Sequence, residues 1–132
     1  MKNFNNLEYL VGNNKSVIAQ SVAPYDQRVC NFLDDLSSEL DKNKEIKKYP
    51  DIKTLAFWCR KKNILNLKEK FISDESRIGL GLIFHITPSN IPTNFAYSLI
   101  FGLLTGNSNI IKVPSKKFDQ VKVICNSINK IL

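Results

Sequence analysis

Three hydrophobic patterns in the second half of the chain predict a strand, a helix and a second strand. Residues 80–86 form a short apolar run bounded by turn-forming residues, which suits a buried strand. From Thr93 the apolar residues recur at helical spacing, and Gly106 supplies a stop because glycine readily takes the left-handed conformation that ends helices. Ile110 and Ile111 form a second short apolar run. This order, with short connections, predicts a βαβ unit and therefore a parallel sheet.

The first half of the chain has mainly helical patterns. Pro24 opens one that runs to about Asp41, with an apolar stripe made of Val29, Phe32, Leu33, Leu36 and Leu40. Residues 42–49 are polar and basic and are expected to form a loop. Asp51 is expected to cap the next helix, Asn63 to interrupt it, and residues 64–71 to add another turn or two.

The two ends of the chain give weaker patterns. Residues 8–11 and 16–19 flank a turn-forming Gly-Asn-Asn segment, so residues 1–22 are expected to form a hairpin or an arm. Residues 73–77 are polar and are expected to be the loop that leads into the first strand. At the other end, residues 115–132 carry apolar residues at helical spacing, with Ser115 as the expected cap.

Length and composition are those of a soluble globular domain. The chain has 132 residues, of which 43% are hydrophobic and 23% charged, so one domain is expected. Its longest uncharged apolar stretch is well short of the ~20 residues that span a bilayer. The N-terminus has no apolar segment typical of a signal peptide. We therefore expect a cytoplasmic chain without a membrane partner.

The cysteines and the histidine offer little for metal or nucleophilic chemistry. Cys30, Cys59 and Cys125 are far apart, form no Cys-x-x-Cys pair and cannot complete a familiar zinc site with one histidine. We expect buried thiols, because free cysteine is among the most buried residue types. His85 lies inside an apolar run and is expected to be a hydrogen-bonded core histidine rather than a base.

The net charge of +7 raises the question of an anionic partner. No arginine-rich stripe, zinc-finger spacing or aromatic ribonucleoprotein motif accompanies the lysines. We therefore expect solvated lysine faces and no nucleic-acid partner, although a basic nucleic-acid binder stays as a weaker alternative. An anionic cofactor explains some of the positive charge equally well.

Candidate chemistry gathers at the ends of the two predicted strands, where βαβ units bind ligands. Residues 85–90 follow the first strand, and residues 112–117 follow the second. The amide of Asn90 can donate a hydrogen bond from a turn between two prolines, as stabilisation of a developing oxyanion requires. The alternative is an asparagine that satisfies the backbone of the turn.

Several motifs in these segments resemble known proteins. Pro-Ser-Asn-Ile-Pro at 88–92, a helix that ends in Gly-Asn, and Ile-Ile-Lys-Val-Pro-Ser at 110–115 together resemble the aldehyde dehydrogenase superfamily. More narrowly, residues 81–90, 95–98, 103–110 and 113–116 look like the LuxC-type fatty acyl-CoA reductases, as do residues 49–51 and 55–61. The resemblance extends from about Tyr49 to the C-terminus.

The resemblance implies a fold, a reaction and a division of the chain. The fold would be α/β, with N-terminal helices packed on a Rossmann-like parallel βαβα unit of an aldehyde-dehydrogenase-like fold. Residues 23–132 would be the N-terminal part of an NAD(P)-binding acyl-CoA reductase domain. The reaction would be the NADPH-dependent reduction of a fatty acyl-CoA to the aldehyde, with Asn90 pointing at the thioester oxygen.

The resemblance also implies a cofactor site. Lys112 matches the ribose-binding lysine of the superfamily, although Val113 is inserted into the Lys-Pro-Ser motif. Ser115-Lys116-Lys117 stands where many superfamily members have a glutamate that disfavours a 2′-phosphate, so we expect NADPH rather than NADH. The expected cofactor-binding residues are Thr87, Pro88, Ser89, Lys112, Ser115 and Lys116.

The catalytic cysteine of this family has no counterpart here. Family members form a thioester on a cysteine in a second domain, and none of the three cysteines matches its surroundings. The chain is therefore expected to be the N-terminal part of a longer reductase. Its expected protein partner is either a further copy of itself, in a homo-oligomer, or a catalytic chain that completes it. The alternative is a non-catalytic nucleotide-binding or interaction module derived from that fold.

Overall fold

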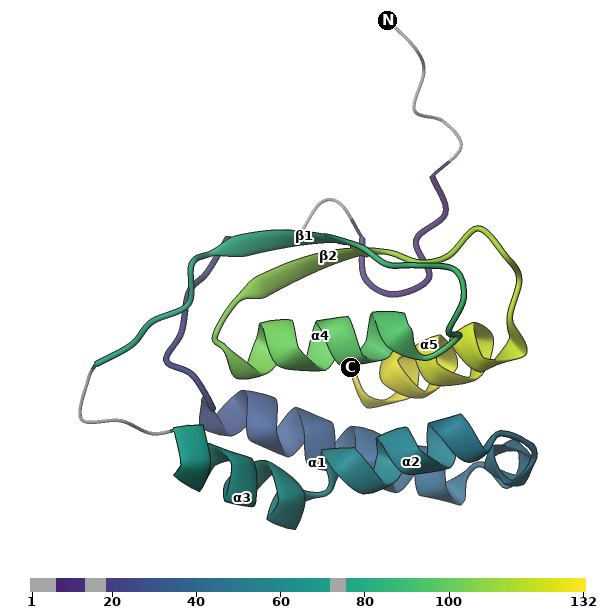
Figure 1. Cartoon of the computed structure of the whole chain (residues 1–132), viewed down its shortest axis with the longest axis horizontal. Helices are drawn as coiled ribbons and strands as arrows, with labels where there is room; N and C mark the ends of the chain where they lie inside the picture. Colours follow the sequence, from purple (N-terminus) through teal and green to yellow (C-terminus); the bar gives the residue numbers. More distant parts are fainter. Residues whose placement is uncertain (1–6, 14–18, 72–75) are drawn as a thin grey trace, which may run out of the picture.

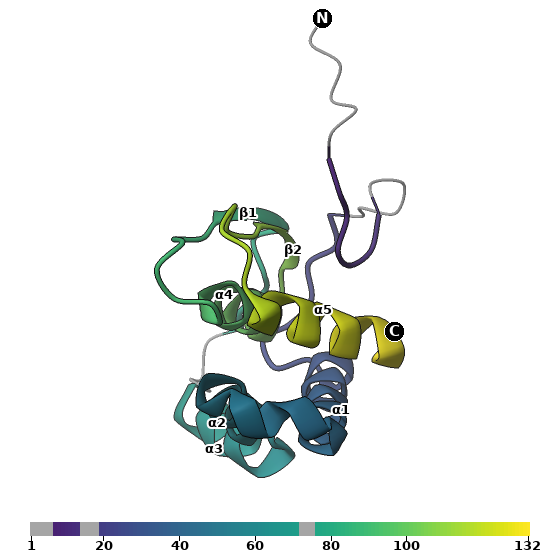
Figure 2. The ribbon, with the colours of Figure 1, turned by 90° about the vertical axis from the view of Figure 1, so that its right-hand side faces the viewer.

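The computed structural model describes residues 7–13, 19–71 and 76–132. Its elements, in chain order, are α1 (Gln27–Lys42), the 3₁₀ helix η2 (Lys44–Lys48), α2 (Pro50–Cys59), α3 (Lys61–Phe71), β1 (Leu82–Ile86), α4 (Asn94–Leu104), β2 (Ser108–Lys112) and α5 (Asp119–Ile131). They stack in layers: the two strands lie over α4 and α5, and α1, α2 and α3 form the layer beneath (Figure 1). The view at right angles shows the same layering (Figure 2).

The two strands and the helix between them form the predicted βαβ unit. β1 and β2 pair in parallel, with Leu82 opposite Ser108 at one end and Ile86 opposite Lys112 at the other. Gly106 follows α4 with φ at 84°, which confirms the predicted glycine stop. The architecture is a helix-rich α/β arrangement with a small parallel sheet. The larger Rossmann-like unit of an aldehyde-dehydrogenase-like fold stays a prediction.

The core lies between the helical layers, where apolar stripes face one another. α1 buries Leu33, Leu36 and Leu40, and α2 buries Ile52 and Leu55. Where α1 meets α2, the buried Ser37 hydroxyl donates a hydrogen bond to the Ala56 carbonyl at 2.6 Å. The predicted stripe is therefore confirmed at its leucines, whereas Val29 and Phe32 are only half-buried at its edge.

Trp58 joins this helical layer to the βαβ unit. Its ring meets those of Phe101 and Tyr97 edge-on, at centroid distances of 5.5 and 6.4 Å. Because both partners lie on α4, the contact fixes α2 against the helix that supports the sheet.

The start of the first helix and the segment that follows it differ from those predicted. α1 begins at Gln27 rather than near Pro24, because the Asp26 carboxylate caps it and accepts a hydrogen bond from the Arg28 N–H at 2.9 Å. The expected loop at 42–49 contains a 3₁₀ helix, which Asn43 caps through the Glu45 N–H. The short side chain of an aspartate or asparagine satisfies an otherwise free backbone donor at each start.

The start of α2 and its break from α3 also differ. Pro50 is the first residue of α2, where its missing N–H costs nothing, and Asp51 lies inside the first turn rather than at the cap. The break falls at Arg60, not at Asn63. Asn63 instead lies in α3, and its amide donates to the Phe57 carbonyl at 2.6 Å, which holds the two helices together across the break.

The closing helix begins later than predicted. α5 starts at Asp119 after Phe118, which has an extended backbone, so Ser115 is not its cap. Phe118 is half-buried against the core. The chain must reach this contact before a helix can pack along α1, and residues 113–118 form that connection.

The N-terminal prediction is only partly covered by the described residues. Residues 7–13 contain no strand, and residues 14–18, which include most of the second expected strand, lie outside the described ranges. Most of the expected loop at 73–77 also lies outside them, at residues 72–75. The arm or hairpin at 1–22 therefore stays a prediction.

Candidate functional site

The carboxyl ends of β1 and β2 are tied together by Thr87. Its side chain is buried, and its hydroxyl donates a hydrogen bond to the Lys112 carbonyl at 3.0 Å, while its N–H points to the same oxygen at 3.4 Å. The two predicted site segments therefore leave the sheet side by side. The Thr87 hydroxyl proton is already used inside the protein. Thr87 could therefore contact a cofactor mainly through its backbone carbonyl, and it also sets the position of the segment that follows.

The segment that follows β1 presents polar groups to solvent. Pro88, Ser89 and Asn90 are all exposed, and the segment makes a bend before α4 begins at Asn94. Within the described part of the chain, no hydrogen-bond partner engages the Asn90 side-chain amide. Asn90 therefore does not fasten its own turn here.

The segment that follows β2 is basic and exposed. Lys112, Ser115, Lys116 and Lys117 all lie at the surface. The Lys116 ammonium sits 5.1 Å from the centroid of the Phe118 ring, a cation–π contact that holds it near the start of α5. An ammonium group held in this way remains open to an anion on its other side.

Asn107 is the main positioning residue that sequence reasoning missed. It is buried, and its carbonyl oxygen accepts hydrogen bonds from the Leu80 and Gly81 N–H groups at 2.6 and 3.2 Å. Its amide nitrogen donates to the Thr105 hydroxyl at 2.9 Å and faces the Gly102 carbonyl at 3.3 Å. One side chain thus fixes the entry into β1 against the end of α4. The Gly-Asn pair after the helix is the available sequence signal, but it indicates a helix end and not a long-range hydrogen bond.

A second polar pair lies on the inner face of the sheet. Asn109 donates to the Asn107 carbonyl at 2.8 Å, so its side-chain oxygen is left to accept from His85 Nε2, also at 2.8 Å. A side-chain carbon at Gly102 would collide with the Asn109 amide, so the glycine in this helix makes room for the pair. The prediction of a hydrogen-bonded histidine is confirmed, although His85 is only half-buried.

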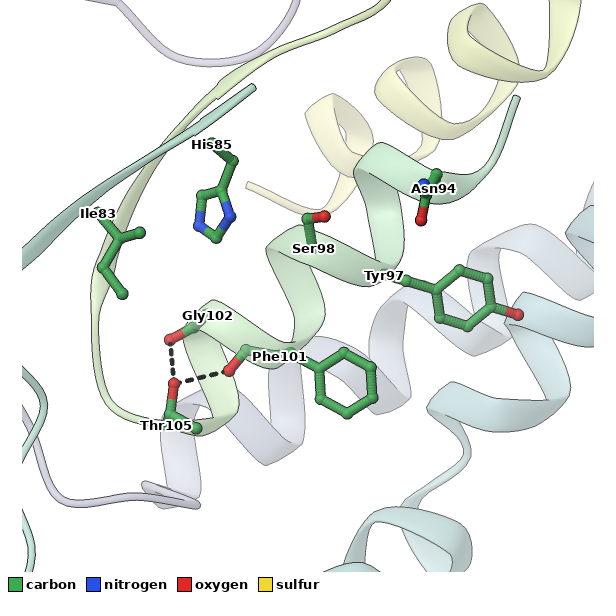
Figure 3. Close-up of a pocket in the computed structure, with 8 residues that line it drawn as sticks. All are labelled: Ile83, His85, Asn94, Tyr97, Ser98, Phe101, Gly102 and Thr105. Carbon is green, nitrogen blue, oxygen red and sulfur yellow. Dashed lines mark hydrogen bonds between the residues drawn. The ribbon is translucent and has the colours of Figure 1, made fainter. Parts of the chain in front are cut away.

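His85 also borders an open pocket of about 450 Å³ between β1 and α4. Figure 3 shows its imidazole extending from β1 toward Ser98 on α4. The lining residues are Ile83, His85, Asn94, Tyr97, Ser98, Phe101, Gly102 and Thr105. All of them belong to β1, to α4 or to the turn that follows α4, and none lies on β2.

The three cysteines are buried free thiols, as predicted. Burial raises the pKa of Cys59 to about 12 and that of Cys125 to about 11. Burial also raises the pKa of Cys30, the largest of several influences on it. A nucleophilic cysteine needs a lowered pKa and access to substrate, and these thiols have neither.

The described part of the chain has neither a metal-binding cluster nor a membrane-spanning helix. Among residues 7–13, 19–71 and 76–132, no three His, Cys, Asp or Glu side chains gather in a way that could hold a metal ion. In the helices of those ranges, length and apolar character fall short of what crossing a bilayer requires.

Polar and basic groups thus lie at the joined carboxyl ends of the strands of a βαβ unit, which is where α/β sheets bind ligands. The family model described as "Acyl-CoA reductase (LuxC)" matches residues 18–131, and the chain belongs to that family. The match begins well before Tyr49, so the first helices are part of the family domain too. No curated protein and no solved structure matches the chain. Membership places the chain among oxidoreductases that act on fatty acyl thioesters and generally depend on a nicotinamide cofactor.

Proposed function

We propose that the chain takes part in the NADPH-dependent reduction of a fatty acyl-CoA to the aldehyde. The observation that carries the proposal is the Thr87–Lys112 junction, which brings the Asn90 turn and the basic segment after β2 to one edge of the sheet. An acyl group and an anionic cofactor must meet in this reaction, and the two segments offer a group for each.

Asn90 is the proposed oxyanion donor. Its amide is exposed and has no partner among the described residues, so a thioester oxygen would not have to displace an internal hydrogen bond. The turn that carries it starts at Thr87, whose anchored side chain limits its movement. Donors held in place before the reaction stabilise a developing negative charge best, and this anchor would hold the start of the turn in place.

The basic segment after β2 is the proposed cofactor site. NADPH would supply the hydride, and the chain would hold its anionic groups through Lys112, Ser115 and Lys116, beside the backbone of residues 87–89. Lys116, held over Phe118, is placed to attract a 2′-phosphate. An attraction between the Lys116 ammonium group and that phosphate would favour NADPH over NADH, which lacks the phosphate.

The nucleophile would come from outside this sequence. The three thiols present are buried and hold their protons at neutral pH, because burial raises the pKa of each. The reactive cysteine would therefore belong to a further segment or to a completing catalytic chain.

Two substitutions test the proposal in the enzyme that joins this chain to its reactive cysteine. Asn90→Ala should lower kcat about 10²–10³-fold, the usual cost of one oxyanion donor, with NADPH affinity nearly unchanged. Asn66→Ala, at an exposed position of α3, is the matched control and should leave kcat unchanged. Unchanged turnover in Asn90→Ala would rule out the oxyanion role.

The cofactor role is tested by reversing one charge. Lys116→Glu should weaken NADPH binding roughly tenfold while changing NADH binding little, because only NADPH carries the 2′-phosphate. Lys47→Glu makes the same change in total charge on η2 and should leave both affinities unchanged. Equal loss with both cofactors, or with both variants, would contradict the assignment of Lys116.

A second function is favoured by the burial of all three thiols. On that reading the chain is a non-catalytic nucleotide-binding module. It would bind NADPH, with the same dependence on Lys116, but no assembly containing it would turn over acyl-CoA in a manner sensitive to Asn90.

A further inference from the structure

The Tyr-Pro-Asp motif at residues 49–51 lies in the helical layer, away from the strand ends that carry the proposed site. Tyr49 follows η2, and Pro50 and Asp51 are the first two residues of α2. The start of α5 lies above the start of α2 in both views of the ribbon (Figures 1 and 2). The motif is therefore close to the point where the basic segment after β2 enters α5.

Two pairs of side chains join the starts of these helices and form what we call the α2–α5 contact. The Tyr49 hydroxyl donates to the Asp119 carboxylate at 3.5 Å, and the Gln120 amide donates to the Asp51 carboxylate at 3.4 Å. Burial, followed by the nearby Asp119 carboxylate, raises the pKa of Tyr49, so its hydroxyl keeps its proton at neutral pH. Each bond is long, but both draw the same two helix starts together.

Neither helix start is fixed by its own cap residue. Tyr49 and Phe118 occupy the N-cap positions of α2 and α5, and neither makes a side-chain capping bond in the described structure. The first N–H groups of a helix have no intrahelical acceptor, and helix ends therefore fray when nothing else holds them. The α2–α5 contact supplies a restraint on α5 that its cap residue does not.

The start of α5 in turn sets the position of Lys116. Phe118 directly precedes α5 and is half-buried, and the Lys116 ammonium lies 5.1 Å from the centroid of its ring. Residues 113–118 contain neither helix nor strand, so their course depends on the segments at their two ends. A displaced first turn of α5 would carry Phe118 with it, and the ammonium group would lose the ring that it contacts.

We propose that Tyr49 and Gln120 are positioning residues for the cofactor site. Through the α2–α5 contact they hold Lys116 where it meets the 2′-phosphate, and they thereby contribute to the preference for NADPH over NADH. The inference rests on the proposed cofactor role of Lys116. A contact that only stabilises the fold would lower the free energy of unfolding without changing the preference between the two cofactors.

Tyr49→Phe tests the proposal because it removes one hydroxyl and changes no charge. Measured on the full chain, the dissociation constant of NADPH should rise about two- to fivefold, the scale of one weak hydrogen bond, while that of NADH changes little. Gln120→Met also leaves the charge unchanged and should act in the same direction. Tyr9→Phe is the matched control, since it removes the hydroxyl of a tyrosine that is 50% exposed, and it should change neither constant.

Two further measurements show whether the effect passes through Lys116. In a Lys116→Ala background, Tyr49→Phe should cause no further loss of NADPH affinity, because residues that act through one contact are not additive. NMR gives a measurement without cofactor. The Phe118 ring should shift the side-chain methylene signals of Lys116 upfield, and Tyr49→Phe should move them toward the values of a free lysine, whereas Tyr9→Phe should not.

Four outcomes would overturn the proposal while leaving the cofactor role of Lys116 intact. They are an unchanged NADPH affinity in Tyr49→Phe, an equal loss with NADPH and NADH, the same loss in the Lys116→Ala background, and unmoved Lys116 signals. Failure of the cofactor role itself would look different. The unsubstituted chain would then bind NADPH no better than NADH, and this inference would fall with that role before any variant is compared.

Discussion

Replacement of Asn107 by alanine should destabilise the fold more than the small number of atoms removed suggests. Its side-chain oxygen is the acceptor for two backbone N–H groups, those of Leu80 and Gly81, at the entry into β1. Alanine would remove that acceptor and leave no replacement in its place. The other two contacts are less critical, because the Thr105 hydroxyl also donates to the Phe101 carbonyl and the Gly102 carbonyl also accepts from the Asn107 N–H.

The size of the effect follows from those two N–H groups. A buried donor without a partner costs about 1–3 kcal/mol, and Gly81 is buried. The Leu80 N–H is part-buried and should cost less, since water can reach it in part. The expected loss is therefore about 2–4 kcal/mol of unfolding free energy, a large share of the ~5–15 kcal/mol typical of a domain.

Urea unfolding followed by circular dichroism measures this loss. Asn107→Ala should lower the midpoint by about 1–2 M without changing the slope. Asn107→Asp keeps an acceptor for both N–H groups and should lose less than half as much. Asn129→Ala is the matched control, because that exposed amide makes a single bond to the Leu10 carbonyl and should cost under about 1 kcal/mol. A loss below about 0.5 kcal/mol in Asn107→Ala would refute the reasoning.

Two further predictions concern backbone strain and buried thiols. Gly106→Ala should cost at least about 1 kcal/mol more than Gly12→Ala in the same urea assay, because both have positive φ but only the new carbon at 106 would collide with the Val22 carbonyl; equal losses would contradict this. Ionisation of Cys59 should not affect the unfolding free energy at neutral pH. The unfolding free energy should fall as pH rises from about 9 to about 12, by up to about 1.4 kcal/mol per pH unit. The sign follows because the unfolded thiol loses its proton near 9.0 while the folded one keeps it to about 12. Cys59→Ala should reduce that alkaline slope, and an unchanged slope would show that burial does not hold the proton.

The elements with strong periodicity could be predicted from sequence, and their boundaries could not. The apolar stripe of α1 and the strand–helix–strand order were visible because each has a single dominant spacing. Boundaries depended on single side chains with several possible partners. Asp51 was expected to be a cap, but Pro50 already fits the first helical position. Ser115 was a plausible cap until the packing of Phe118 placed the start of α5 later.

The candidate site shows the same division. The sequence indicated which two segments carry polar groups, since strand ends collect them. It could not show that Thr87 joins the segments, because the acceptor is a backbone carbonyl 25 residues away. Nor could it show that Asn107, rather than its glycine neighbour alone, holds β1 against α4. Long-range bonds from a side chain to the backbone leave no periodic signal.

The most direct test of the central claim is NADPH binding by the isotope-labelled chain, mapped residue by residue with NMR. The account predicts that shifts concentrate at the backbone N–H signals of the non-proline residues in 87–90 and 112–116, at the carboxyl edge of the sheet, and that NADH gives the same map with weaker binding. No shifts at saturating NADPH, or shifts confined to α1, α2 and α3, would contradict it.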